Sequence, residues 1–321
     1  MQKNTSRTAS LVEAGILSAI AVVFALINLY TPFLGAFLNV VWPVPLIILG
    51  VRHGLRWSGL SLLTAGTIVA LLVNPLQSLL LVIGLGFIGL TLGWSIRKNN
   101  PPLLTIGIGS IVSFIAKILV FALIFLLVGV NPLDVSPETV TKITDDVINF
   151  YRSMGVSEAD LERNRAMMEP VFELMRVILP AGIILASFID TFINFWVSQK
   201  ILRRLGSHVP DLPAFRNLVF PQSILLFYGL SLLSIYFFRE QQPLETYHRI
   251  AINFNMLCGL PILLQGVAVA WSHIDGTRWA NVLRGLLLGS LFVTQFMPLA
   301  MVFLGIADFV MDFRKLRPPR G

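Results

Sequence analysis

Residues 180–204, PAGIILASFIDTFINFWVSQKILRR, decide the fold of this chain. The stretch is apolar, ends on basic residues and is long enough to cross a bilayer, whose hydrocarbon core takes about 20 helical residues. At helical spacing Gly182, Ala186, Asp190 and Asn194 lie on one face, where small residues lead to an acid and an amide. Small residues let helices approach closely, and polar groups at membrane depth normally face protein or water. The stretch therefore predicts a membrane helix that packs in a bundle and carries a polar spot.

The composition extends this prediction to the whole chain. Of the 321 residues, 55% are apolar and 13% are charged, and the mean hydropathy is +0.79. A soluble domain cannot bury so much apolar surface. The apolar runs are continuous rather than alternating, which favours helices over a membrane barrel. The predicted fold is all-α, a polytopic transmembrane helical bundle of eight to ten spans with an outer amphipathic helical insertion.

The basic residues predict how the chain is oriented. The net charge is +7, but Lys and Arg stand beside the ends of the apolar runs, as in Arg52, Arg97 and Arg203. The tendency of basic residues to stay in the cytoplasm explains this placement, so we expect membrane lipid and no nucleic acid as a partner. The predicted location is the bacterial cytoplasmic (inner) membrane, with several passes and a cytoplasmic N-terminus.

We expect one membrane domain over residues 1–321. Residues 11–130 hold the first five spans, residues 131–173 an extracytoplasmic amphipathic insertion, and residues 174–321 the remaining spans and a basic tail. In the insertion, Ser136 followed by Pro137 is typical of a helix start. Ser157 with Asp160 resembles a capping box, which predicts a second helix running on into the sixth span. This insertion is either a lid over a cavity or a segment resting in the membrane interface.

The last apolar run, Gly285 to Asp312, allows two topologies. A single span would leave the tail RKLRPPRG outside, against the positive-inside tendency. A short hairpin turning near residues 294–298 would return the tail, although each leg would have only about 15 residues instead of the usual ~20. We favour the hairpin.

Polar side chains inside the spans are the candidates for a binding site. The second span, Phe33 to Val51, carries Asn39, Trp42 and two prolines, and the resulting kink makes it a candidate cavity wall. Lys117, near the middle of the fifth span, has Asp190 of the antiparallel sixth span as its predicted partner. A purely structural ion pair is the alternative. The eighth span adds three amides. The candidate substrate-binding residues are Asn39, Trp42, Lys117, Asp190, Asn194, Asn253, Asn255 and Gln265.

Small residues predict close helix contacts. In the first span they recur at Ala14, Ser18, Ala21 and Ala25, a stripe that serves either packing within the bundle or docking of a partner subunit, for which Ala21 and Ala25 are the candidates. In the fourth span, Gly89 and Gly93 form a similar pair.

Motifs for other chemistries are missing from the sequence. It has one cysteine, Cys258, no phosphate-binding loop with a Walker lysine, and no His-Glu-x-x-His. The four histidines fall in predicted loops, so no histidine stands in a span to activate a nucleophile. We therefore expect no enzyme, no metal site and no cofactor. An enzyme acting on lipid at the interface, with Arg52, His53 and the acids of the outer insertion as acid-base groups, is the remaining catalytic alternative.

Several motifs along the chain resemble the YybS-like family of bacterial membrane proteins, for which no activity is established. The motifs are LVEAGILSAIAVVFALINLYTPFLG (11–35), WPVPLIILGVRHG (42–54), ILRRLG (201–206), Pro210, Pro213, Phe215, Pro221, Pro261, Gln265, Gly266, Gly305, Asp308, Asp312, Phe313 and Arg314.

The first five or six spans are also distantly similar to the substrate-binding S components of energy-coupling factor transporters. In that family an Ala-x-x-x-Ala pattern on the first helix docks a coupling transmembrane subunit, and Ala21 to Ala25 matches it. The resemblance implies a small solute bound toward the outer side and partner transmembrane and ATPase subunits, although this chain is several spans longer. The expected function is a solute-binding or transport subunit. The alternative is a membrane scaffold or interaction protein in envelope or spore assembly.

Overall fold

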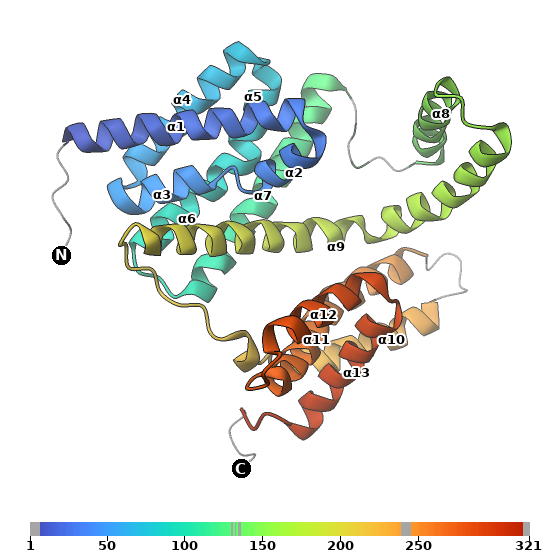
Figure 1. The fold of residues 1–321 in the computed structure, drawn as a ribbon. Helices are drawn as coiled ribbons and strands as arrows, with labels where there is room; N and C mark the ends of the chain where they lie inside the picture. The colour runs from blue at the N-terminus through green and yellow to red at the C-terminus, as the bar shows by residue number, and fades with distance from the viewer. Residues whose placement is uncertain (1–6, 130, 132, 134–135, 239–244, 317–321) are drawn as a thin grey trace. The chain divides into compact units, whose positions relative to one another are not determined.

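The computed structural model describes residues 7–129, 131, 133, 136–238 and 245–316. All regular structure in these ranges is helical (Figure 1), as the sequence predicts. The helices before the insertion are α1 (Arg7–Tyr30), α2 (Pro32–Val40), α3 (Val44–His53), α4 (Leu55–Leu72), α5 (Pro75–Leu81), the π-helical turn η1 (Val82–Gly86), α6 (Phe87–Arg97) and α7 (Pro102–Val128). The later ones are α8 (Pro137–Ser153), α9 (Glu158–Arg204), the 3₁₀ turn η2 (Phe215–Asn217), α10 (Ser223–Phe238), α11 (Glu245–Ile274), α12 (Ala280–Val293) and α13 (Phe296–Met311).

Within the described ranges, six segments are long and apolar enough to cross a membrane, and the bent pair α12 and α13 makes up to seven. The second and seventh predicted spans are present as shorter apolar helices, Phe37–His53 and Ser223–Phe238. Most of the apolar surface of these helices stays exposed; in α7 only 11% of the span is buried. Such a surface is stable against lipid and not against water. The polytopic helical membrane bundle is therefore confirmed.

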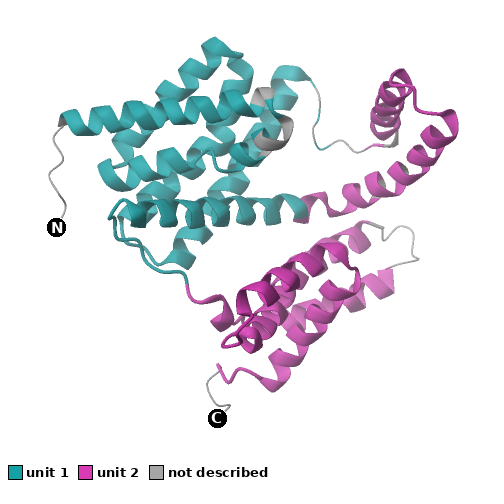
Figure 2. Cartoon of the chain, in the orientation of Figure 1, with its two compact units in different colours: residues 1–134, 182–212 teal, residues 135–181, 213–321 magenta. Residues whose placement is uncertain are grey.

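The chain divides into two compact units (Figure 2). Unit 1 comprises residues 1–134 and 182–212, and unit 2 comprises residues 135–181 and 213–321. The long helix α9 therefore gives its first part to unit 2 and its second part to unit 1. The single membrane domain expected over residues 1–321 stays a prediction, and residues 317–321 of the basic tail lie outside the described part.

The predicted kink in the second span is a complete break. A turn at residues 41–43 separates α2 from α3, because Pro43 and Pro45 lack the N–H groups that a continuous helix would need. Trp42 fills the break and is fully buried, and its indole Nε1 donates to the carbonyl oxygen of Ala21 at 2.8 Å.

The small-residue stripe of the first span is used inside unit 1. Ala21 and Ala25 are buried and pack with Trp42 and with residues of α3 and α4. This is the bundle-packing alternative. A docking partner would find almost no exposed surface at these two alanines. The exposed face of α1 carries larger apolar residues such as Leu11 and Ile16.

Glycines bring α3 and α6 into backbone contact. A Cβ atom on Gly93 would lie 3.1 Å from the Cα of Gly50, and one on Gly89 would lie 2.9 Å from the Cβ of Leu46. The predicted Gly89 and Gly93 pair therefore faces a neighbouring helix, as small-residue pairs in membrane helices commonly do.

Buried hydroxyl groups join neighbouring helices of unit 1. Each such bond satisfies a polar group that neither lipid nor the apolar core could satisfy. The bonds join Ser18 to Ser61 at 2.7 Å, Ser58 to the Leu46 carbonyl at 2.8 Å, Ser78 to the Gly66 carbonyl at 2.6 Å, and Ser95 to Thr105 at 2.8 Å.

The helix starts predicted in the insertion are confirmed. Ser136 caps α8 by accepting from the Thr139 amide at 3.3 Å, and Ser157 accepts from the Asp160 amide at the same distance. The helix that follows, α9, continues through Pro170 and Pro180 into the sixth span, as expected. Arg165 pairs with Asp145 and so links α9 to α8.

In unit 2, α11 and α13 cross at two glycines. A Cβ atom on Gly266 would lie 1.8 Å from the Met301 carbonyl oxygen, and one on Gly305 would lie 2.1 Å from the Ile262 carbonyl oxygen. The preceding α12 meets α13 at a bend of 113° between residues 293 and 296. After α13 the side chain of Arg314 reaches the carbonyls of Arg216 and Leu218. The chain thus turns back within this stretch, while the number of spans that it forms stays a prediction.

Replacing Gly266 by Ala should lower the stability of the protein by about 2 kcal/mol or more, because the new methyl group overlaps the backbone of α13. Unfolding of the purified protein in detergent measures the change. Gly289→Ala in α12 is the matched control, since nothing lies within 4 Å of its added Cβ. Equal stability of the two variants would contradict the close crossing.

Candidate functional site

Lys117 of α7 and Asp190 of α9 form the predicted ion pair. The Nζ and Oδ2 atoms are 2.5 Å apart, and Nζ also donates to Ser113 Oγ at 2.9 Å. Each charged side chain is 21% exposed. Two opposite charges at this depth in apolar helices stabilise each other, because an unpaired charge in hydrocarbon costs about 3 kcal/mol on insertion scales. The pair is partly exposed, and its two predicted roles, a binding site and a structural ion pair, both stay predictions.

Asn194 lies one turn after Asp190 and closes the break in the second span. Val44 donates its amide to Val41 instead of Val40, so the Val40 carbonyl is left without its helical partner. The Asn194 Nδ2 donates to this carbonyl and to the Asp190 carbonyl, each at 2.8 Å. Its Oδ1 atom is buried and has no hydrogen-bond partner. One amide acceptor thus stays unsatisfied beside the ion pair.

The other two candidates of unit 1 lie at the same break. Asn39 is partly buried, and its carbonyl oxygen accepts from the Trp42 amide at 3.3 Å. Trp42 itself is a core residue with its only polar atom bonded to Ala21, so the structure corrects its predicted place in a cavity wall. Lys117, Asp190 and Asn194 are the candidates that the structure brings together, and Asn39 precedes Val40, whose carbonyl Asn194 binds.

Asn253 of α11 forms hydrogen bonds with two backbone groups of α9 next to Pro180. In an uninterrupted helix the Ala181 amide would donate to the Val177 carbonyl, but Pro180 disturbs α9 at this point. The Asn253 Oδ1 accepts from Ala181 N at 2.8 Å and its Nδ2 donates to Val177 O at 2.6 Å. The amide therefore bonds both of the backbone groups that a regular helix would bond to each other. All its groups are in use, because Nδ2 also donates to the Arg249 carbonyl.

The remaining two amides also join helices of unit 2. Asn255 donates to Ser231 of α10 at 2.9 Å. Gln265 is fully buried, accepts from the Phe220 amide at 3.1 Å and donates to Asp308 at 2.9 Å. The eight candidates therefore fall in two units, and those of unit 2 bind other parts of that unit.

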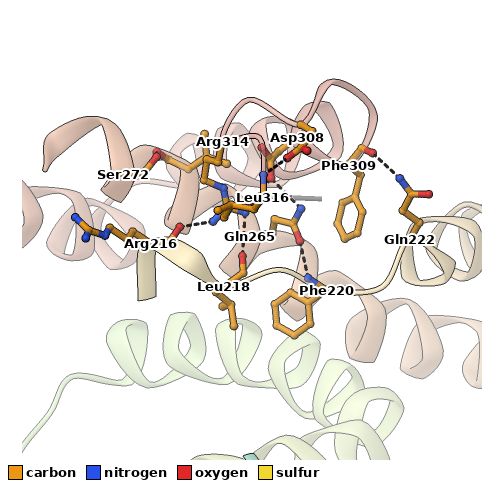
Figure 3. A network of polar contacts seen from close by, with 12 residues as sticks. Arg216, Leu218, Phe220, Gln222, Gln265, Ser272, Asp308, Phe309, Arg314 and Leu316 are labelled. Carbon is orange, nitrogen blue, oxygen red and sulfur yellow. Dashed lines mark hydrogen bonds and ion pairs between the residues drawn. The ribbon is translucent and has the colours of Figure 1, made fainter. Parts of the chain in front are cut away.

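Asp308 and Arg314 are polar residues that the sequence analysis gave no role. Figure 3 shows Arg314 between Asp308 and the loop before α10. Its guanidinium lies 2.9 Å from Asp308 Oδ2 and donates to the carbonyls of Arg216 and Leu218 at 2.7 and 2.9 Å. The side chains of Arg314 and Asp308 are 5% and 2% exposed. An acid inside an apolar helix followed two turns later by arginine is the signal that could have found them.

The prediction that all four histidines lie in loops is wrong for three of them. His53 ends α3, and His248 and His273 lie in α11. The His53 side chain is only 1% exposed. Its Nε2 lies 2.7 Å from Glu13 Oε2, its Nδ1 lies 2.8 Å from Ser10 Oγ, and Glu13 also pairs with Arg52 at 3.0 Å. Glu13 thus joins α1 to α3.

In the part of the chain that the structure describes, no three His, Cys, Asp or Glu side chains gather in a way that could hold a metal ion. The residues that could hold a ligand are therefore neutral amides and one ion pair in unit 1 and the basic side chains near Arg314 in unit 2.

Comparisons with known proteins agree with the family resemblance. The family described as "Predicted membrane protein (DUF2232)" matches residues 19–309. The "Uncharacterized protein YybS" of Bacillus subtilis (strain 168) is 23% identical over 315 residues, which cover 96% of this chain and 98% of that protein. No solved structure matches the chain. The resemblance to the YybS-like family is thereby confirmed, while the one to S components stays an expectation.

Lys117→Ala and Asp190→Ala should each destabilise the protein by about 2 kcal/mol, since each leaves the other charge unpaired among apolar helices. The double variant should lose less than the sum of the two, with a coupling of about 1 kcal/mol or more. Unfolding of the purified variants measures all three values. Strict additivity would contradict the ion pair.

Asn253→Ala should lower stability by about 2 kcal/mol, because it leaves the Val177 carbonyl and the Ala181 amide without partners. In a Pro180→Ala background the Ala181 amide can bond the Val177 carbonyl directly, as in a regular helix. The same substitution should then lower the stability by about half as much or less. Unfolding of the four proteins tests this coupling. An equal loss in both backgrounds would show that Asn253 does not replace the backbone bond.

Proposed function

The chain belongs to the DUF2232 family of predicted membrane proteins, and from this premise we propose that unit 1 binds a small polar solute beside Lys117 and Asp190. On this proposal the protein is a solute-binding or transport subunit of the bacterial cytoplasmic membrane, with a cytoplasmic N-terminus, and it binds its ligand without transforming it.

The observation that carries the proposal is the partly exposed ion pair. Ionisable residues at membrane depth are costly to keep, and they commonly mark solute or ion pathways. Lys117 and Asp190 present both signs of charge within 2.5 Å, and about a fifth of each side chain is open. A ligand that carries both a carboxylate and an ammonium group could pair with Lys117 and Asp190 at once, so that no charge is left unpaired.

An unsatisfied polar atom on Asn194, one helical turn from Asp190, supports the same site. Asn194 Oδ1 and Ser198 Oγ lie one turn apart on α9, and both are buried without a hydrogen-bond partner. Buried polar groups in native proteins are nearly always bonded, so each exception calls for an explanation. A solute that carries an N–H or O–H group would satisfy Asn194, and this requirement favours a polar solute over a lipid chain.

The division into units also favours solute binding. The resemblance to S components covers the first five or six spans, and these spans, with the second part of α9, are the helices of unit 1. The sequence holds no ATP-binding loop, so on this proposal coupling transmembrane and ATPase subunits supply the energy. Because Ala21 and Ala25 are buried, such a subunit would contact the exposed apolar face of α1.

A second candidate is a membrane scaffold or interaction protein without a transported solute, in envelope or spore assembly. One observation favours it: Trp42, Asn253, Asn255 and Gln265 all form hydrogen bonds with the chain's own helices or loops. On this proposal the polar residues hold the helices together, and the ligands are other proteins.

Purification in mild detergent followed by native mass spectrometry distinguishes the two. For a solute-binding subunit, the wild-type protein should carry a small bound mass and co-purify with an ATPase. The charge-free double variant Lys117→Met, Asp190→Leu should lose the small mass and keep the partners. Asn255→Leu, which removes an amide from unit 2, is the control and should retain the mass. Envelope proteins alone, with no small mass in any sample, would favour the scaffold.

A further inference from the structure

A polar cleft of about 250 Å³ lies in unit 2, apart from the residues of the proposed solute site. Its lining is Arg216, Asn217, Ser272, His273, Phe313, Arg314 and Leu316. Figure 3 shows Arg216, Ser272, Arg314 and Leu316 around the network of Asp308. A water molecule takes about 30 Å³ of the liquid, so the cleft has room for on the order of eight waters, or for a phosphate with a few attached atoms.

Three chain segments build the cleft at the ends of apolar helices. The short turn η2 carries Arg216 and Asn217, α11 ends after Ser272 and His273, and the segment after α13 supplies the rest. Two long apolar helices stop here, so the cleft lies where a membrane helix meets the headgroup region. Arg314 fixes the third segment to the first through the Arg216 and Leu218 carbonyls.

The charges around the cleft favour an anion. The segments 213–222, 272–284 and 308–316 carry five Arg or Lys residues and three Asp residues. Asp308 pairs with Arg314, and Asp275 pairs with both Arg216 and Arg284. Hydrogen bonds from Arg284 and then Arg216 hold the pKa of Asp275 below its ordinary value, so it remains a carboxylate. Because Asp275 carries one negative charge and pairs with two arginines, Arg216 and Arg284, one positive charge remains.

Donors remain for a ligand. The Arg216 side chain is 55% exposed and pairs with Asp275 through one nitrogen, Nη1, at 3.1 Å. The Arg314 Nε is buried and has no hydrogen-bond partner. His273 lines the cleft, and its Nδ1 lies 2.9 Å from the Val269 carbonyl. The carbonyl ends of α11 and α13 oppose an anion, but guanidinium groups bind phosphate more strongly than a helix end repels it.

The rim of the cleft is apolar. Phe313 and Leu316 are both exposed beside the two arginines. Basic pockets at the ends of membrane helices commonly bind lipid head groups, whose chains need apolar neighbours. We propose that this cleft binds a phosphate-bearing anion, through Arg216 and Arg314, at the membrane surface. The same phosphate chemistry fits an anionic phospholipid head group and a free phosphate ester.

The test measures lipid binding to the purified full-length protein by native mass spectrometry. Phosphatidylglycerol should bind and phosphatidylcholine, which has no net charge, should bind at least about tenfold more weakly. Arg216→Gln should weaken phosphatidylglycerol binding about tenfold. This variant should fold, because Asp275 keeps Arg284 as its partner. Displacement of the lipid by millimolar inorganic phosphate would identify a free phosphate ester as the ligand, and no displacement would identify the lipid.

Arg278→Gln is the matched control, since it removes the same charge nearby from a residue that does not line the cleft. It should weaken binding by about twofold or less. If Arg216→Gln and Arg278→Gln weakened phosphatidylglycerol binding equally, the lipid would bind to the basic surface in general and not to the cleft, and the proposal would be wrong. Equal binding of the two lipids would also overturn it. Neither result depends on the site at Lys117 and Asp190.

Discussion

A proline inside an apolar helix leaves backbone carbonyl or amide groups without their helical partners. The structure of this chain depends on the side chains that bond these groups instead. Lipid offers no donor or acceptor, so each open carbonyl or amide needs a partner from the protein. Asn194 closes the Val40 carbonyl at the break between α2 and α3. Asn253 closes the Val177 and Ala181 groups at the proline of α9. In both cases one amide side chain fixes a broken helix to its neighbour.

This constraint separates structural polar residues from those that are open to a ligand. Asn253 and Gln265 use both ends of their amides on the protein, so they are accounted for by the fold. Asn194 uses only its nitrogen and leaves a buried oxygen next to a partly exposed ion pair. Arg216 and Arg314 leave positive charge at a cleft with an apolar rim. Each proposed ligand site holds a buried polar atom without a hydrogen-bond partner, Asn194 Oδ1 in unit 1 and Arg314 Nε in unit 2.

Much of the fold could be predicted because its signals are local. The cap residues Ser136 and Ser157 begin helices by accepting from amides three residues on, and Pro43 and Pro45 lack the amide N–H groups that a continuous helix would use. The pairing of Lys117 with Asp190 was also predictable, because a charge at membrane depth requires a partner and few were at hand. The histidines were placed wrongly. Composition does not reveal that the last turn of a helix can bury His53 between Ser10 and Glu13.

The sequence by itself determined that this is a helical membrane protein, where most helices start and stop, and which residue types need polar partners. Hydropathy, caps and prolines act over a few residues, so they can be read along the chain. Only the tertiary structure decided that Trp42 is core, that Ala21 and Ala25 are covered, and that Asn253 repairs another helix. These outcomes depend on contacts between segments far apart in the chain, such as residues 177 and 253, whose rotation and depth no local pattern specifies.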